Sequence, residues 1–286
     1  MRISRTLLAG ATALTATLGL LCASPAARAA TPNTPTPHVA PAPLPDLLPS
    51  AQAPAAAGSG PVCWFGACYD YVSGRQLTDV SGASIRMLQA EPRIKPGDTE
   101  SHSLQELALQ SADQKSTVEI GWTVDLGLNG DTRPHLFVYH WVNGAESCYN
   151  GCGFVQVSRT VKPGMAVRPG TAAGFAIENL AGDWWAFYDG QAVGYFPGAL
   201  WQGGYTRAQL VTAFGEVAHA TGSTCEQMGD GRDGTRHGSS WIGDFRLTGS
   251  TDTPALTVTA TSPNLYDAGR LTRTSFRLGG PGSGPC

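Results

Sequence analysis

Two glutamates in separate strand-like segments carry the chemistry that this sequence suggests. Glu119 lies in the segment 116–125, where Val, Ile and Trp alternate with Thr, Glu and Gly, and Glu216 lies in the segment 214–219. Because strand side chains point alternately to opposite faces, we expect the apolar set to pack inward and Glu119 to project from the other face. Two carboxyls brought together on such a face can share one proton, since neighbouring like charges resist joint ionisation. This is the chemistry of an acid-active hydrolase, although spacing alone does not bring the two residues together.

The histidines and glycine-rich loops do not form a catalytic triad or a metal site in this sequence. His135 and His140 differ by an odd number of positions, so on one strand they point to opposite faces and do not easily share an ion. Neither Gly-x-Ser-x-Gly nor His-Glu-x-x-His is present. The loop 229–234 lacks the spacing and terminal Glu of a calcium loop. We therefore predict no metal and no cofactor, and we expect the strand histidines to be hydrogen-bonded structural residues.

The chain divides into three segments by composition. Residues 1–29 have the pattern of an export signal, with Arg2 and Arg5 before an apolar run and Ala-Arg-Ala at its end. Residues 30–60 are rich in Ala, Pro, Thr and Ser, which is typical of an extended linker or a short propeptide. Residues 61–286 are predicted to form one folded catalytic domain. We expect the protein to be secreted.

Charge and hydropathy limit the partners. Acidic residues (22) exceed basic residues (19) and no basic patch is present, so we predict no nucleic-acid partner. The apolar run of the signal is too short for a permanent anchor, so we expect no membrane association after the signal is removed. We expect a monomer.

The cysteines favour a disulfide-bonded exported protein. Six of the seven lie after the signal, and an even number in an exported chain favours bridges over a zinc site. The simplest pairing joins Cys63 to Cys68, Cys148 to Cys152 and Cys225 to Cys286, although fifteen pairings are formally possible.

Short alternating segments separated by Gly, Asn and Asp turns predict an all-β fold, either an antiparallel sandwich or a barrel. The dipeptide Asp189-Gly190 between two such segments indicates a tight hairpin. Only two stretches favour helix, 103–109 and the capping-box spacing of Thr206 and Gln209. The expected strands span residues 116–125, 135–142, 153–157, 184–188, 191–196, 240–247, 256–261 and 274–278.

Eight segments in one order resemble the neprosin family of glutamic peptidases. The resemblance covers roughly Ser101 to Cys286, and no single segment is diagnostic. The segments are Val118-Glu-Ile-Gly-Trp122, His135-Leu-Phe-Val-Tyr-His-Trp141, Cys148-Tyr-Asn-Gly-Cys-Gly-Phe-Val-Gln156, Gly182-Asp-Trp-Trp185, Val193-Gly-Tyr-Phe-Pro197, Phe214-Gly-Glu-Val217, Met228-Gly229 and Gly279-Gly-Pro-Gly282. Phe214 stands where the family often has Trp. Plant members carry a long folded prodomain, whereas about thirty Ala/Pro-rich residues precede Cys63 here.

The resemblance implies a two-sheet antiparallel sandwich with a concave active-site cleft and one or two short helices. It also implies an endopeptidase that cleaves after proline at acidic pH without a metal, with Glu119 and Glu216 as its catalytic residues. Proline-containing peptides or proteins are then the partners. The Cys148–Cys152 bridge matches a family loop.

The mechanism expected from this resemblance uses one ionised and one protonated glutamate around a water. Because the pair titrates together, the assignment of Glu119 as acid and Glu216 as base is a choice between microstates. Candidate substrate-binding residues are Trp122, Trp184 and Tyr195 as walls of a proline pocket. Gln156, Tyr195 or a backbone N–H could stabilise the oxyanion.

Two alternatives use the same residues differently. A glycoside hydrolase could use the carboxyl pair, with their separation setting the stereochemistry. A lectin-like module would bind ligand through its aromatic residues without catalysis.

Overall fold

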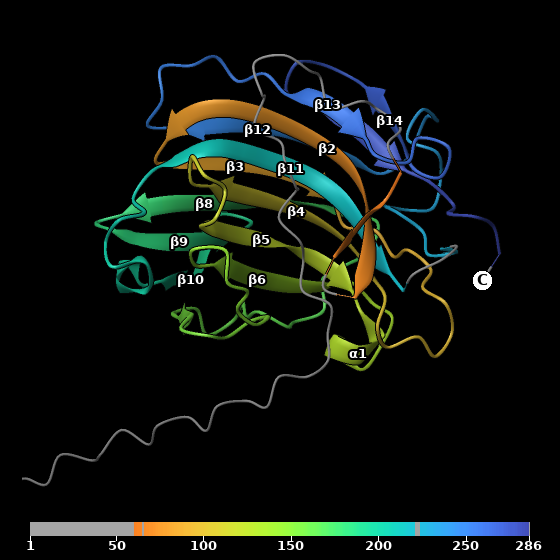
Figure 1. The fold of residues 1–286 in the computed structure, drawn as a ribbon, viewed down its shortest axis with the longest axis horizontal. Coiled ribbons are helices and arrows are strands. Elements are labelled where there is room, and N and C mark those ends of the chain that lie inside the picture. Colours follow the sequence, from red (N-terminus) through yellow and green to blue (C-terminus); the bar gives the residue numbers. More distant parts are fainter. Residues whose placement is uncertain (1–59, 65, 221–223, 286) are drawn as a thin grey trace, which may run out of the picture. The chain divides into compact units, whose positions relative to one another are not determined.

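The computed structural model describes residues 60–64, 66–220 and 224–285. The predicted export signal, the linker as far as residue 59, and Cys286 lie outside the described residues. The described part consists of two antiparallel sheets, one behind the other in Figure 1, which are not closed into a barrel. The sandwich alternative is therefore the correct one.

The first sheet contains both predicted glutamates. Its strand order is β1-β2-β11-β4-β5-β6, with β13 also paired to β2. The strands are β1 Val62–Trp64, β2 Ala67–Val80, β4 His102–Gln110, β5 Thr117–Val124, β6 His135–Trp141, β11 Ala208–His219 and β13 Thr257–Ala260.

The second sheet has the order β14-β15-β12-β3-β8-β9-β10-β7. Its strands are β3 Gly82–Leu88, β7 Val155–Gln156, β8 Ala172–Leu180, β9 Asp183–Tyr188, β10 Gln191–Phe196, β12 Trp241–Thr248, β14 Asp267–Arg270 and β15 Phe276–Gly279. The hairpin β9–β10 turns at Asp189 and Gly190, whose φ angles of 47° and 78° are those that an Asp-Gly turn supplies.

The core between the sheets is built by strand alternation. Val118, Ile120, Trp122 and Val124 of β5 all point into it and are fully buried. They share this cluster with Phe175 of β8. Each large apolar side chain buried in this way contributes roughly 1.5–3 kcal/mol. The other face of β5, which bears Glu119, therefore points away from the space between the sheets.

The two helix predictions are wrong. Residues 103–109 belong to strand β4, and the segment after Thr206 leads into strand β11. Helix propensity is a weak preference, and here pairing of β4 with β5 on one side and β11 on the other overrides it. The short helices lie elsewhere, as α1 (Leu126–Asn129) and the 3-10 turn η1 (Gly198–Trp201). Within the described residues, no helix has the length and apolar character needed to span a membrane.

Two disulfides lie in the described part of the chain, Cys63–Cys68 and Cys148–Cys152. The first joins paired residues of β1 and β2, and the second closes the loop after β6. Cys225 is also disulfide-bonded, and the predicted partner, Cys286, lies outside the described residues.

Gly121 of β5 permits close packing next to the glutamates. A Cβ atom there would lie 2.2 Å from the Gln105 carbonyl oxygen and 2.8 Å from Cε1 of Phe137. We expect Gly121→Ala to destabilise the protein by about 1–3 kcal/mol, since neither backbone nor ring can yield easily. The midpoint of thermal unfolding should fall by about 3–10 °C.

Gly174→Ala is the matched control for this substitution. Gly174 is also a strand glycine, but its nearest neighbour would lie 4.0 Å from an added Cβ. An unfolding midpoint for Gly121→Ala equal to that of the control would contradict the close packing described for β5.

Candidate active site

One face of the first sheet carries three glutamates on three adjacent strands. Glu216 lies on β11, Glu106 on β4 and Glu119 on β5, and all three are fully buried. They point away from the space between the sheets, because their neighbours in sequence point into it. We call this surface the glutamate face. Sequence analysis placed Glu119 correctly on it and did not identify Glu106.

The strand register sets the order of these carboxyls. Glu216 is paired with Leu104, two residues before Glu106 on β4. Glu119 is paired with Ala108, two residues after Glu106. The three glutamates therefore form a diagonal line across the sheet, with Glu106 in the middle. Diagonal neighbours on a sheet are about 7–8 Å apart at the backbone, so each end of the line is one such step from Glu106.

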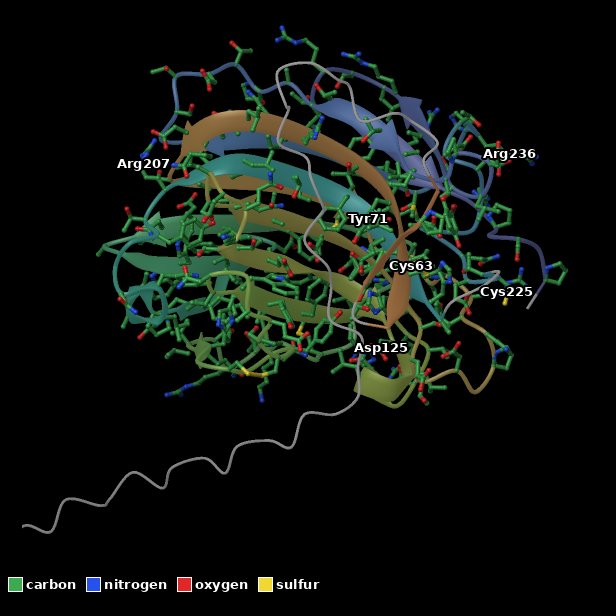
Figure 2. The ribbon with its side chains drawn as sticks, viewed as in Figure 1. Cys63, Tyr71, Asp125, Arg207, Cys225 and Arg236 are labelled. Atoms are coloured by element: carbon green, nitrogen blue, oxygen red, sulfur yellow. A yellow bond between two sulfur atoms is a disulfide. The ribbon has the colours of Figure 1, made fainter. Side chains whose placement is uncertain are left out.

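Glu216 is held by two hydrogen-bonding side chains. Nε2 of His102 lies 2.8 Å from its Oε1 atom, with both side chains fully buried. The Tyr71 hydroxyl also forms a hydrogen bond with Glu216. Tyr71 lies on β2, directly opposite Glu216, and is labelled in Figure 2. Donors around a carboxylate favour its ionised form.

His102 is the donor in its bond to Glu216. Burial lowers the pKa of the His102 imidazole to about 4, although the charge of Asp125 acts in the opposite direction. A neutral imidazole has a single N–H, and in this contact it donates from Nε2 to the carboxylate. Above about pH 4 the imidazole is therefore a neutral donor to the Glu216 carboxyl.

Glu119 has the opposite electrostatic setting. Burial raises its pKa well above the ordinary value, the charge of Glu216 raises it further, and the Trp141 side chain acts the other way. Neither carboxyl oxygen of Glu119 has a hydrogen-bond partner among the described residues. Burial therefore favours the protonated form of Glu119 over the charged form. Glu119 and Glu216 thus differ in environment in the manner that separates an acid from a base.

Glu106 is as deeply buried as its two neighbours. Neither of its carboxyl oxygens has a hydrogen-bond partner among the described residues. Burial raises its pKa, and the charges of Glu119 and Glu216 raise it further. Reading 102–110 as a strand would have placed Glu106 on this face. The helix-like composition concealed that pattern.

Aromatic side chains surround the carboxyls on this face. Tyr149, in the loop closed by Cys148 and Cys152, packs edge-on against Phe137 and Tyr139 with ring centroids 5.4 and 5.2 Å apart. The Tyr149 hydroxyl is buried and has no hydrogen-bond partner among the described residues. The pKa of this hydroxyl is raised by burial and by several acidic residues, including Glu216 and Glu106. The loop therefore brings a hydroxyl donor into the electrostatic field of the cluster.

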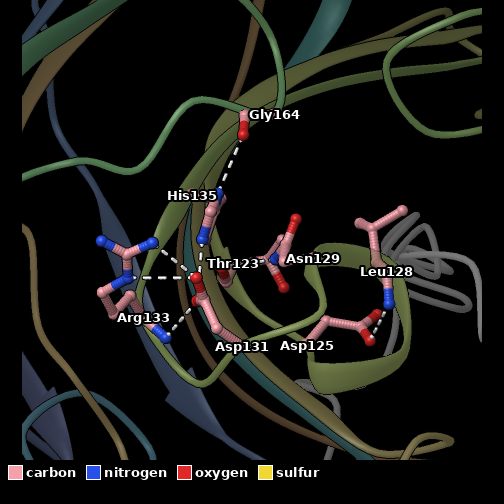
Figure 3. Close-up of polar contacts among 8 residues, drawn as sticks. All are labelled: Thr123, Asp125, Leu128, Asn129, Asp131, Arg133, His135 and Gly164. Carbon is pink, nitrogen blue, oxygen red and sulfur yellow. Dashed lines mark hydrogen bonds and ion pairs between the residues drawn. The ribbon is translucent and has the colours of Figure 1, made fainter.

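The connection from β5 to β6 is a polar structural element, shown in Figure 3. Asp125 caps α1 by accepting a hydrogen bond from the Leu128 amide at 2.8 Å. His135 contacts Asp131 through Nε2 at 2.9 Å and the Gly164 carbonyl through Nδ1 at 2.8 Å. Hydrogen bonds from Arg133 lead the interactions that lower the pKa of Asp131. These hydrogen bonds hold the first residue of β6, His135, in place, so His135 has a structural role.

The predicted substrate-binding residues do not lie on the glutamate face. Trp122 and Trp184 belong to the core between the sheets, where their indole nitrogens donate to the carbonyls of Leu88 and Tyr205. Trp122 is an odd number of positions from Glu119, so the strand period sends it to the opposite face. The structure therefore does not bring Trp122 or Trp184 to the glutamates.

Gln156 lies on β7 and Tyr195 on β10, and these two strands pair with each other at the edge of the second sheet. Gln156 is exposed and donates to the Ser158 carbonyl. Tyr195 stacks on Trp185 with ring centroids 4.7 Å apart, on the face of β10 opposite the core residue Phe196. The structure therefore does not bring Gln156 or Tyr195 to the glutamates.

The remaining histidines of the strands have structural surroundings. His140 packs in the core against Phe196 and Trp201, and His219 contacts Asp70 at 3.2 Å. Over residues 60–64, 66–220 and 224–285, no cluster of three or more His, Cys, Asp or Glu side chains has an arrangement suited to a metal ion.

Several solved structures share features of this fold. Scytalido-glutamic peptidase with a transition-state analog inhibitor is 10% identical, with 73% of this chain and 97% of that chain covered and a TM-score of 0.47. SCP-B of the eqolisin family, with the tripeptide Ala-Ile-His, is 9% identical, with 73% and 96% covered and a TM-score of 0.38. Chicken galectin 2 is 10% identical, with 50% and 98% covered and a TM-score of 0.28.

The family profile of neprosin matches residues 99–281. This range includes the strands that carry Glu106, Glu119 and Glu216, together with the loop that carries Tyr149. It covers well over half of the 286 residues. The chain belongs to the neprosin family of glutamic peptidases.

Proposed function

We propose that this protein is a secreted, acid-active endopeptidase that cleaves peptide bonds after proline with Glu119, Glu216 and an activated water. The observation that carries the proposal is that two fully buried glutamates lie on one sheet face in different surroundings. Hydrogen-bond donors surround Glu216, whereas burial favours the protonated form of Glu119 and only Trp141 among the described residues acts against it. Carboxyls with different environments can divide the roles of acid and base.

Glu216 serves as the general base in this proposal. The hydrogen bonds from His102 and Tyr71 favour its carboxylate form and fix its orientation. Glu119 serves as the general acid, because burial and the charge of Glu216 keep its proton in place. This agrees with the roles expected from the sequence.

The reaction then proceeds in two steps. Glu216 takes a proton from a water, whose oxygen forms a bond to the scissile carbonyl carbon while protonated Glu119 donates a hydrogen bond to the carbonyl oxygen. The tetrahedral intermediate collapses as the C–N bond breaks, and the amine leaves with a proton from Glu119. The products are a carboxyl terminus and an amine. Glu216 then releases the proton that it took from the water and Glu119 regains one, which restores the starting state, so no reactant other than water is needed.

The Tyr149 hydroxyl serves as a donor to the oxyanion of that intermediate. It is a buried O–H on the same side of the sheet as the carboxyls, and its pKa is raised by burial, so it keeps its proton at any pH where the enzyme works. Such donors are effective when aimed at the charge that develops in the transition state. It replaces Gln156 and Tyr195 in this role.

A preference for proline is supported by the aromatic character of the glutamate face. Proline offers a flat apolar ring that packs well on aromatic side chains. The aromatic residues of this face are Tyr69, Tyr71, Phe137, Tyr139, Trp141 and Phe214, with Tyr149 packed against them. These residues take the place of Trp122, Trp184 and Tyr195 as candidate walls of the pocket.

Secretion is supported by the disulfides within the described residues. Such bridges persist in oxidising compartments and are rare in reducing ones. Two local bridges close short loops here, and Cys225 is bonded as well.

We expect Glu119→Gln and Glu216→Gln each to lower kcat by at least about 100-fold while the protein remains folded. The assay is cleavage of a proline-containing peptide at about pH 4–5, where carboxyls titrate. A matched peptide with alanine in place of proline tests the preference, and a polysaccharide substrate tests the glycosidase alternative. Glu178→Gln, on the second sheet, is the control for loss of a carboxyl outside the site. Near-normal turnover by either catalytic variant would overturn the proposed pair.

Tyr149→Phe should lower kcat about 10- to 1000-fold with little change in KM, because it removes a donor to the transition state and leaves the ring in place. Steady-state kinetics on the same peptide measure this. Tyr195→Phe removes a hydroxyl from the other sheet and should have wild-type kinetics. An unchanged kcat for Tyr149→Phe would exclude this hydroxyl as the oxyanion donor.

The contribution of Glu119 to stability should fall as pH rises from about 4.5 to 7. Burial raises the pKa of Glu119 in the folded state, so above the ordinary carboxyl pKa the folded state binds more protons than the unfolded state. The stabilisation is complete below the unfolded pKa and is lost as the pH approaches the folded pKa. Each pH unit in that interval costs about 1.4 kcal/mol per such carboxyl.

Burial lowers the pKa values of His102 and His140 to about 4, so between about pH 4 and 6.5 these histidines make stability rise with pH and oppose Glu119. The Glu119 contribution is therefore measured as the difference between wild type and Glu119→Gln in urea unfolding at several pH values. A difference that does not change between pH 4.5 and 7 would show that the pKa of Glu119 is not raised in the folded protein.

A further inference from the structure

Glu106 occupies the only position on β4 that is a diagonal neighbour of both Glu216 and Glu119. Glu119 and Glu216 lie on strands separated by β4, two strand spacings or about 9–10 Å apart across the sheet. Their rows also differ by four residues along β4, from Leu104 to Ala108. Glu106 lies midway between Leu104 and Ala108 on β4, so its side chain lies between those of Glu119 and Glu216.

The groups that face Glu106 from the neighbouring strands are acidic or neutral. They are Glu119 from β5, Glu216 from β11 and the hydroxyls of Tyr71 and Tyr149. His102, on its own strand, is neutral and bonded to Glu216.

The cation on this face of the sheet is more remote. Arg75 of β2 pairs with Thr212 of β11, which in turn pairs with Ala108 of β4. Arg75 therefore lies two strands from Glu106 and level with Ala108, and it is partly exposed. Asp125 lies at the end of β5, and the exposed Glu146 lies in the loop before Cys148, and both are acidic. Hence none of the described residues places a cation next to Glu106 that would compensate a negative charge there.

Three carboxylates cannot remain ionised together in such a place. Their mutual repulsion and the cost of burial are relieved when protons are retained. Glu216 accepts hydrogen bonds from His102 and Tyr71, and these donors favour its ionised form. The pKa of Glu106 is raised by burial first, then by the charges of Glu119 and Glu216, so its protonated form is favoured.

We propose that Glu106 is a positioning residue that stays protonated and donates its O–H to the Glu216 carboxylate. This inference rests on the proposed function, since its effect is to orient the base and to leave the cluster with a single negative charge. A protonated carboxyl has one donor, and neither Glu106 oxygen has a hydrogen-bond partner, Glu216 included, among the described residues. The side chain therefore has its proton available for the neighbouring carboxylate.

Replacement of Glu106 by Met and by Gln separates this role from simple packing. Both have about the length of Glu, but only Gln keeps a neutral hydrogen-bond donor. Glu106→Met should lower kcat about 10- to 100-fold with KM nearly unchanged, because the base loses its orientation. Glu106→Gln should recover kcat to within a few-fold of wild type.

The pH profile adds a readout that packing would not move. Loss of the donor raises the pKa of Glu216, so the acidic limb of the kcat profile should shift to higher pH in Glu106→Met and stay in place in Glu106→Gln. Gln110→Met is the control, since Gln110 is a buried polar residue on the same strand and face. A wild-type profile for Glu106→Met, or equal losses in the Met and Gln variants, would overturn the proposal.

Infrared spectroscopy tests the proton directly and without catalysis. In Glu119→Gln at neutral pH, the protonated-carboxyl band of Glu106 should remain, and it should disappear in the double variant Glu119→Gln/Glu106→Gln. Identical spectra would show that Glu106 is ionised and would end the proposal even if the Met variant failed to fold. If the band is present but the wild-type protein cleaves no peptide, the proposed function fails and the protonation of Glu106 stands.

Discussion

Repulsion among three buried carboxyls is the constraint on which the chemistry of this molecule depends. Glu106, Glu119 and Glu216 lie on adjacent strands with no exposed surface and no cation beside Glu106 within the described part of the chain. In water such groups would ionise independently near pH 4. In this setting they compete for protons, so the ionisation of one determines the state of the next. In the proposed mechanism, the fold thus holds both an acid and a base at one pH by placing identical side chains in unequal surroundings.

The unequal surroundings follow from what each strand supplies. β2 and β4 bring Tyr71 and His102 to Glu216, whereas neither carboxyl oxygen of Glu119 has a hydrogen-bond partner among the described residues. Two donors favour the charged form of Glu216, and a neutral histidine adds a donor without neutralising the negative charge. The histidine is therefore better understood as a fixed hydrogen-bond donor than as a titrating group.

Strand alternation made part of this arrangement predictable from the sequence. The segment 116–125 has a clear apolar period of two, so both the strand and the face of Glu119 could be inferred. β4 has no such pattern because all of its residues are buried, on both faces. Its Leu, Gln, Glu and Ala residues have helical preferences, and only pairing with strands far away in the sequence overrides them. Glu106 and His102 were missed for this reason.

The same pairing explains why a single register decides the chemistry. Side chains on β4 alternate, so Gln105 points to the core, where it accepts a hydrogen bond from the Ser240 hydroxyl, and Glu106 points to the cluster. A slip of one residue would exchange these two side chains and bury a carboxyl between the sheets. Ladders on both sides of β4 prevent that slip, and Gly121 lets β5 approach closely at the level of Glu106. Backbone pairing at the centre of a sheet, rather than loop conformation, therefore sets the spacing of the carboxyls, and the precision required of an acid and a base is of the kind that such elements supply.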